Sequence, residues 1–190
     1  MYRESISKEE LKDLPLKQFE GNISLIDKIW QVDNAVEFLS EHEVIGFDTE
    51  TRPSFKKGKV NKVALLQLST DSHAFLFRIN KIGLPETLKK LLQSKKIIKP
   101  GIAIRDDIKV LQELNGFSPQ GFIELQDQVK DFGIQNFSLK KLAGIVLGFR
   151  VSKAQQLSNW EATTLTPPQM LYAATDAWVS FKIYKNLFPN

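Results

Sequence analysis

The sequence predicts a single domain of the mixed α/β class, for three reasons. Three strand-like segments follow one another between residues 44 and 79, and helix-like and strand-like segments alternate after them. This order is expected when helices cover the faces of one mixed sheet. A chain of 190 residues is long enough to bury one sizeable core. No internal repeat or low-complexity tract divides it.

Composition and charge restrict the function classes. The hydrophobic fraction of 42% and the charged fraction of 25% are typical of a globular protein. Without cysteine the chain has neither disulfides nor thiolate chemistry, which agrees with a reducing compartment, and we expect a cytoplasmic protein. No apolar run approaches the roughly 18 residues of a membrane span, so no membrane partner is expected. The excess of 26 Lys and Arg over 22 Asp and Glu permits binding to a polyanion.

The N-terminal half is predicted to contain most of the strands. Residues 1–21 are interpreted as an extension with a short helix, which a capping box at 7–10 begins. Residues 22–190 are interpreted as the functional domain. Strands are expected at 22–27, 44–51, 63–70 and 73–79, and a helix at 33–42. A Pro/Gly/Lys-rich loop at 52–62 follows the second strand.

From residue 85 onward, helical patterns dominate. Helices are expected at 85–93, 104–114, 138–149 and 167–187, with a buried strand at 95–103 and an extended run at 121–128. A polar loop at 151–160 precedes the last and longest helix, whose first turn tolerates Pro168.

The strand VIGFDTET carries two carboxylates where an apolar core is expected. Asp48 and Glu50 point to the same side because side chains alternate along a strand. Burying two unpaired like charges costs several kcal/mol each. Either the strand end opens to water or a cation lies between the carboxylates. An isolated pair of this kind is more often the start of a solvated acidic loop, so its meaning depends on partners elsewhere in the chain.

Two helices supply such partners. On the helix at 104–114, Asp107 shares a face with apolar residues, whereas Asp106 faces solvent. On the final helix, Tyr172 and Asp176 are four residues apart and therefore neighbours on one face. A tyrosine hydroxyl that simply pairs with a carboxylate in the same helix is the alternative.

Oxygen-only ligands from several elements indicate a hard cation. The four inward-leaning carboxylates come without cysteine, and His42 and His73 show no ligand spacing, so Mg²⁺ or Mn²⁺ is favoured over zinc. Two such ions about 4 Å apart use this many carboxylates, and that arrangement serves phosphoryl transfer.

Three motifs resemble a known family. The stretches FDTE, GIAIRDD, and SNW with LYAATDA resemble the motifs of the DEDDy 3′–5′ exonucleases, which include ribonuclease D and the Werner-type exonuclease domain. The likeness covers about residues 23–188 and implies a ribonuclease H-like fold with a five-stranded mixed sheet flanked by helices. It implies that Asp48, Glu50, Asp107 and Asp176 bind two divalent cations, Mg²⁺ or Mn²⁺, and that Tyr172 positions the attacking water.

The resemblance also implies an activity. A two-metal-ion 3′–5′ exonuclease removes nucleoside 5′-monophosphates from the 3′ end of DNA or RNA, so the expected partner of residues 22–190 is a nucleic acid. Thr51 departs from the pattern, because Werner-type domains usually carry a bulky aromatic residue there. A catalytically inactive nucleic-acid-binding module on the same fold is the alternative, although such a module would be expected to have lost some of these acids.

Basic and aromatic residues near the motifs are candidate substrate contacts. Those after the first motif are Arg52, Phe55, Lys56, Lys57, Lys59 and Lys62, of which Phe55 could stack on a base. Thr49 lies between the two acids of the motif, where the resemblance implies a backbone contact near the terminal nucleotide. A second set before SNW comprises Arg150, Lys153 and Gln156. For each of them a solvated surface loop is the alternative, and Trp160 is interpreted as a core anchor.

Overall fold

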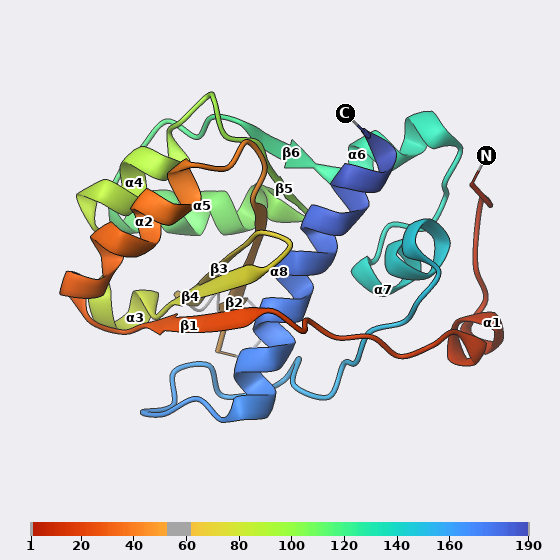
Figure 1. Ribbon diagram of the computed structural model, residues 1–190, viewed down its shortest axis with the longest axis horizontal. Coiled ribbons are helices and arrows are strands. Elements are labelled where there is room, and N and C mark those ends of the chain that lie inside the picture. Colours follow the sequence, from red (N-terminus) through yellow and green to blue (C-terminus); the bar gives the residue numbers. More distant parts are fainter. Residues whose placement is uncertain (1, 53–61, 190) are drawn as a thin grey trace.

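A computed structural model of the protein describes residues 2–52 and 62–189. These residues form a mixed sheet flanked by helices (Figure 1). The strands are β1 (Asn22–Ile26), β2 (Gly46–Thr51), β3 (Val63–Ser69), β4 (His73–Phe77), β5 (Lys99–Gly101) and β6 (Phe122–Glu124). The described part of the chain thus has six strands rather than the expected five. The additional strand is β6, because part of the extended run at 121–128 pairs with β5.

The six strands divide into two hydrogen-bonded groups. Four of them lie in the order β1-β4-β3-β2, and β5 pairs with β6. A parallel bridge between Val44 and Ile98 joins the groups, with a hydrogen bond of 2.9 Å from Ile45 N to Ile98 O. Strands β2, β3 and β4 are antiparallel, whereas β1 runs parallel to β4 and β5 parallel to β6. This mixture matches the predicted mixed sheet.

Helices precede, connect and follow the strands. The α-helices are α1 (Lys8–Asp13), α2 (Val32–Ser40), α3 (Ile79–Ile82), α4 (Glu86–Leu92), α5 (Ile104–Leu114), α6 (Leu125–Gln128), α7 (Leu139–Leu142) and α8 (Pro167–Leu187). Short 3₁₀ turns occur at Ile29–Gln31 and Val129–Phe132, and a π-helix at Ala143–Leu147 continues α7. The predicted bounds of α5 and α8 are confirmed. No helix of the described residues is long and apolar enough to cross a membrane.

The two faces of the sheet are covered by different helices. Helices α2, α4 and α5 lie on one side, and α8 crosses the other (Figure 1). Phe47 of β2 belongs to the core under α2, α4 and α5. Leu65 and Leu76, of β3 and β4, pack with Ala173 and Ala174 of α8. Because side chains alternate, the residues on either side of Phe47 face α8.

Gly46 allows α8 to lie directly against β2. A Cβ atom at this position would be 2.0 Å from the carbonyl oxygen of Ala177 and 2.8 Å from the backbone nitrogen of Phe181. Such separations are impossible, so only glycine permits this close approach. The contact places α8 beside the strand residues that follow Gly46, and these include the two carboxylates of VIGFDTET.

Candidate active site

Three carboxylates meet where β2 lies against α8. Asp48 and Glu50 come from β2 and Asp176 comes from α8, and one carboxylate oxygen of each lies within 4.8 Å of the others. Asp176 is buried, with 7% of its surface exposed. Two elements far apart in the sequence therefore bring together three of the four acids that the sequence analysis selected.

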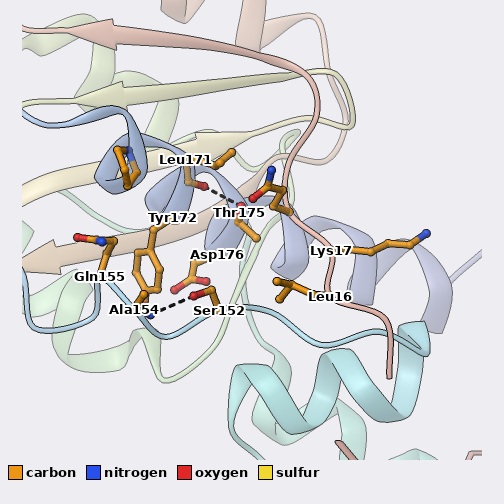
Figure 2. A pocket seen from close by; sticks show the side chains of 11 residues that line it. Leu16, Lys17, Ser152, Ala154, Gln155, Leu171, Tyr172, Thr175 and Asp176 are labelled. Carbon is orange, nitrogen blue, oxygen red and sulfur yellow. Dashed lines mark hydrogen bonds between the residues drawn. The ribbon is translucent and has the colours of Figure 1, made fainter. Parts of the chain in front are cut away.

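Tyr172 lies one helical turn before Asp176, and both residues line one pocket. Figure 2 shows the two side chains pointing from α8 toward the loop that carries Ser152 and Gln155. The Tyr172 ring packs beside Trp160, with ring centroids 6.0 Å apart. Trp160 is completely buried, which confirms its interpretation as a core anchor.

The fourth acid lies beside the three rather than among them. Asp107, in the first turn of α5, accepts a hydrogen bond of 2.7 Å from the Thr49 hydroxyl. Its neighbour Asp106 has a side chain that is 90% exposed, while Asp107 is half-buried. The amphipathic pattern therefore selected the inward-facing aspartate correctly. The Thr49 side chain is placed as a support for Asp107, a role that the sequence did not indicate.

Burial and mutual repulsion make the ionised form of this cluster costly. Burial, followed by the charges of Asp176 and Asp107, holds the pKa of Asp48 well above its usual range. Burial and the neighbouring acids raise the pKa of Glu50 to about 10. Burial raises the pKa of Asp176 to about 7. A bound cation relieves this repulsion, and buried carboxylate oxygens are the donors that Mg²⁺ and Mn²⁺ prefer, so the residues fit a hard divalent ion.

The Tyr172 hydroxyl keeps its proton. Burial and then the charges of Asp176 and Glu50 raise its pKa above the ordinary value. Tyr172 therefore offers a neutral hydroxyl, and the interaction of this hydroxyl with Asp176 lowers the pKa of that carboxyl. A neutral hydroxyl in this place can both donate and accept a hydrogen bond, which is what holding a water molecule requires.

Two lysines approach the cluster from outside the three motifs. Lys140 of α7 and Lys153 of the following loop line a pocket together with Tyr172 and Asp176. After the Tyr172 contact, their charges are the main influences that lower the pKa of Asp176. The sequence analysis selected Lys153 as a candidate. It did not select Lys140, because a lysine in the helical stretch SLKKL is typical of a solvated helix face.

Two further residues lie beside the carboxylates or their supporting elements and were missed. Gln67 of β3 stands directly opposite Asp48, is completely buried, and its amide nitrogen and oxygen have no hydrogen-bond partner among the described residues. Glu124 of β6 accepts hydrogen bonds of 2.9 Å from both Ala103 N and Ile104 N, which fixes the start of the helix that carries Asp107. The available signal in each case was a polar residue inside an apolar run.

The other candidate substrate contacts do not form one cluster in the described part of the chain. Phe55, Lys56, Lys57 and Lys59 lie outside the described residues. Arg52 forms an ion pair of 3.5 Å with Glu161, and Lys62 is exposed. Among the second set, Gln156 lines the pocket with Tyr172 and Asp176, and Arg150 donates a hydrogen bond of 3.0 Å from Nε to Leu14 O.

A comparison with known families decides what this site belongs to. The family model described as 3′–5′ exonuclease matches residues 23–190. The chain belongs to the 3′–5′ exonuclease family. Members of this family are hydrolytic nucleases that act on nucleic acids. The mouse bifunctional 3′–5′ exonuclease/ATP-dependent helicase WRN is 35% identical over 194 residues, and the match covers 96% of this chain but only 14% of the mouse protein.

Solved structures of exonucleases share the fold. The exonuclease domain of Aedes aegypti Nibbler superposes with a TM-score of 0.79 at 24% identity, covering 90% of each chain. RNase D of Trypanosoma brucei, solved in complex with RNA U12, gives a TM-score of 0.79 at 20% identity over 90% of this chain and 64% of that one. The predicted ribonuclease H-like α/β fold is thereby confirmed.

Proposed function

We propose that the protein is a DEDDy-type enzyme that hydrolyses the terminal phosphodiester bond at the 3′ end of a nucleic acid and releases nucleoside 5′-monophosphates. The observation that carries this proposal is the convergence of Asp48, Glu50 and Asp176 beside Tyr172. It occurs in a chain that the 3′–5′ exonuclease family model matches over residues 23–190. An inactive binding module has no use for three clustered, mutually repelling acids, so the enzyme is favoured.

The acids divide between two cations of the Mg²⁺ or Mn²⁺ type. Asp48, Glu50 and Asp176 would hold one ion, and Asp107, together with Asp48, would hold the second. When bound, such ions supply positive charge and Lewis acidity at the scissile phosphate. Thr49 supports this division because its hydroxyl fixes the Asp107 carboxylate by a hydrogen bond of 2.7 Å.

The protein's own groups position the reactants. The neutral Tyr172 hydroxyl orients a water molecule for in-line attack, and the packing of its ring on buried Trp160 holds that hydroxyl in place. Lys140 and Lys153 line the pocket with Tyr172 and Asp176, where their positive charges attract the phosphate. Each of these contributions increases the time that water and phosphate spend in a reactive geometry.

A time course on labelled oligonucleotides tests the proposed function. Matched single-stranded DNA and RNA, labelled at the 5′ end, are incubated with Mg²⁺, Mn²⁺ or EDTA and separated on a denaturing gel. We expect a ladder that shortens from the 3′ end, requires the cation, and releases nucleoside 5′-monophosphates; the faster ladder identifies the preferred substrate. Binding of both strands without cleavage under either metal would support the inactive module instead.

Replacing Tyr172 by phenylalanine is expected to lower kcat by up to about a hundredfold, the cost of losing alignment of a reacting group. KM should change little, because the ring and its packing stay in place. Tyr184→Phe, near the other end of the same helix, is the matched control and should leave kcat unchanged. A Tyr172→Phe enzyme with the wild-type kcat would reduce Tyr172 to a structural residue.

A further inference from the structure

A groove lined by basic side chains lies between α1, α7 and the segment 150–153. Six of its lining residues are basic, and we call this surface the basic groove: Lys8, Lys12, Lys140, Lys141, Arg150 and Lys153. The other described residues that line it are Leu11, Ser138 and Val151, so the lining contains no acidic side chain within 2–52 and 62–189. The surface therefore suits an anionic ligand.

The basic groove opens into the pocket of the acidic cluster. Ser138, Lys140, Val151 and Lys153 line both the groove and the pocket that contains Tyr172 and Asp176. A strand whose 3′ end lies at Asp176 can therefore continue past these shared residues, along α7 toward α1. The continuity makes the groove a natural path for the nucleotides that precede the cleaved one.

Asp176 is the acidic residue whose charge acts on Lys140 and Lys153, at the end of the groove that meets the pocket. Within the ranges 2–52 and 62–189, none of the six basic residues forms an ion pair with a carboxylate. Glu10 of α1 is engaged elsewhere, with the Ser7 backbone at 2.8 Å and Arg3 at 2.9 Å. The other two acidic residues of this helix, Glu9 and Asp13, are exposed and do not line the groove. Burial, and next the charge of Lys153, lowers the pKa of Lys140. These like charges repel one another until an anion binds.

Helix α1 forms a fixed wall of the groove. Ile6 is buried, and Leu11 and Leu14 pack over Gly144, where a Cβ atom would be 2.6 Å from Leu11 Cδ1. The backbone continues this attachment, since Arg150 N donates a hydrogen bond of 2.9 Å to Pro15 O. A wall held in this way keeps its lysines at a constant distance from α7.

We propose that the basic groove binds the sugar–phosphate backbone of the nucleotides on the 5′ side of the scissile bond. Lys8 and Lys12 of α1 then contact phosphates remote from the reacting one. This inference rests on the proposed function, because it assumes a strand end at Asp176. Contacts with phosphates alone are indifferent to base sequence and sensitive to salt. The N-terminal helix therefore sets how tightly a long strand is held, whereas the chemistry at the 3′ end does not depend on it.

The double variant Lys8→Gln/Lys12→Gln tests this role. Lys95→Gln/Lys96→Gln is the matched control, because it removes the same charge from exposed lysines between α4 and β5. Dissociation constants for a single-stranded 12-mer are measured in EDTA at 50 to 200 mM salt. The logarithm of the association constant falls linearly with the logarithm of the salt concentration. Losing two phosphate contacts makes this slope less steep by about 1.4. Between 50 and 200 mM salt, the variant should therefore lose about sevenfold less affinity than the wild type. The control should keep the wild-type slope.

Two further measurements separate the possible outcomes. Lys141→Gln, in α7 on the other side of the groove, should make the slope less steep by about 0.7, the value for one phosphate contact. Cleavage of a dinucleotide with Mg²⁺ should be unchanged in all of these variants. A wild-type slope in Lys8→Gln/Lys12→Gln, or a loss of dinucleotide cleavage, overturns the role of the groove while the exonuclease assignment stands. Absence of cleavage by the wild-type protein defeats the proposed function itself.

Discussion

Asn in place of Asp48 is expected to abolish hydrolysis while the protein becomes more stable in the absence of cations. The amide cannot supply the anionic ligand that the cations require, so we expect turnover to fall at least about a thousandfold, which corresponds to about 4 kcal/mol of lost transition-state stabilisation. The stability should rise because the substitution removes one buried charge from a cluster in which burial and neighbouring acids oppose ionisation.

The same cluster predicts how stability depends on pH. Its carboxyls have higher pKa values in the folded protein than in the unfolded chain, so the folded state binds more protons. Without cations, the wild-type protein therefore loses stability as pH rises from about 4, where unfolded carboxyls ionise. The loss continues through the pKa of about 7 of Asp176 and of about 10 of Glu50. The Asp48→Asn protein should show a shallower loss.

Urea unfolding in EDTA at several pH values, together with turnover in Mg²⁺, measures both effects. Asp106→Asn is the matched control, because Asp106 is an exposed aspartate that pairs with Lys109 at 3.0 Å. It should leave turnover unchanged and alter the pH dependence less than Asp48→Asn does, because the charge of Asp106 comes after burial among the causes that raise the pKa of Asp107. Wild-type turnover in the Asp48→Asn protein would remove Asp48 from the cation site.

Gly46→Ala is expected to cause the largest loss of stability. The added Cβ would lie 2.0 Å from the carbonyl oxygen of Ala177, and the conflicting atoms belong to the backbone of α8 and cannot rotate away. Helix α8 must therefore move off β2. We expect the free energy of unfolding to fall by at least about 3 kcal/mol, the upper end of the usual cost of overpacking.

Gly116→Ala is the control for this experiment. A Cβ atom at Gly116 meets nothing within 4 Å, so the added methyl group has no steric cost. Unfolding in urea compares the two variants, and turnover of the Gly46→Ala protein should also fall, because Asp176 moves away from Asp48 with the helix. Equal stabilities for the two variants would contradict the close contact between α8 and β2.

Periodicity and local spacing made much of the site predictable from the sequence. Asp48 and Glu50 share a face because a strand alternates, and Tyr172 is a neighbour of Asp176 because a helix repeats every 3.6 residues. Amphipathicity separated Asp107 from Asp106 for the same reason. The long segments α5 and α8 were located correctly. The apolar face of α5 is periodic, and α8 begins with a capping box and two prolines.

The rest of the site depends on pairings that a local pattern does not contain. Strand β6 has three residues and pairs with β5 from across an intervening helix, so its own sequence looked only extended. Gln67 acquires its position from the register between β2 and β3, which places it opposite Asp48. Lys140 becomes part of the site only because α7 packs near α8. In each case the tertiary arrangement, rather than residue type, gives the side chain its role.

The central claim is that Asp48, Glu50 and Asp176 form a site for divalent cations. The most direct test is a calorimetric titration of the wild-type protein and the Asp48→Asn variant with Mn²⁺ at neutral pH, without nucleic acid. We predict saturable binding to the wild-type protein, with release of the protons that the raised pKa values retain, and a loss of that binding in the variant. Equal binding by both proteins, or none by the wild type, would contradict the site.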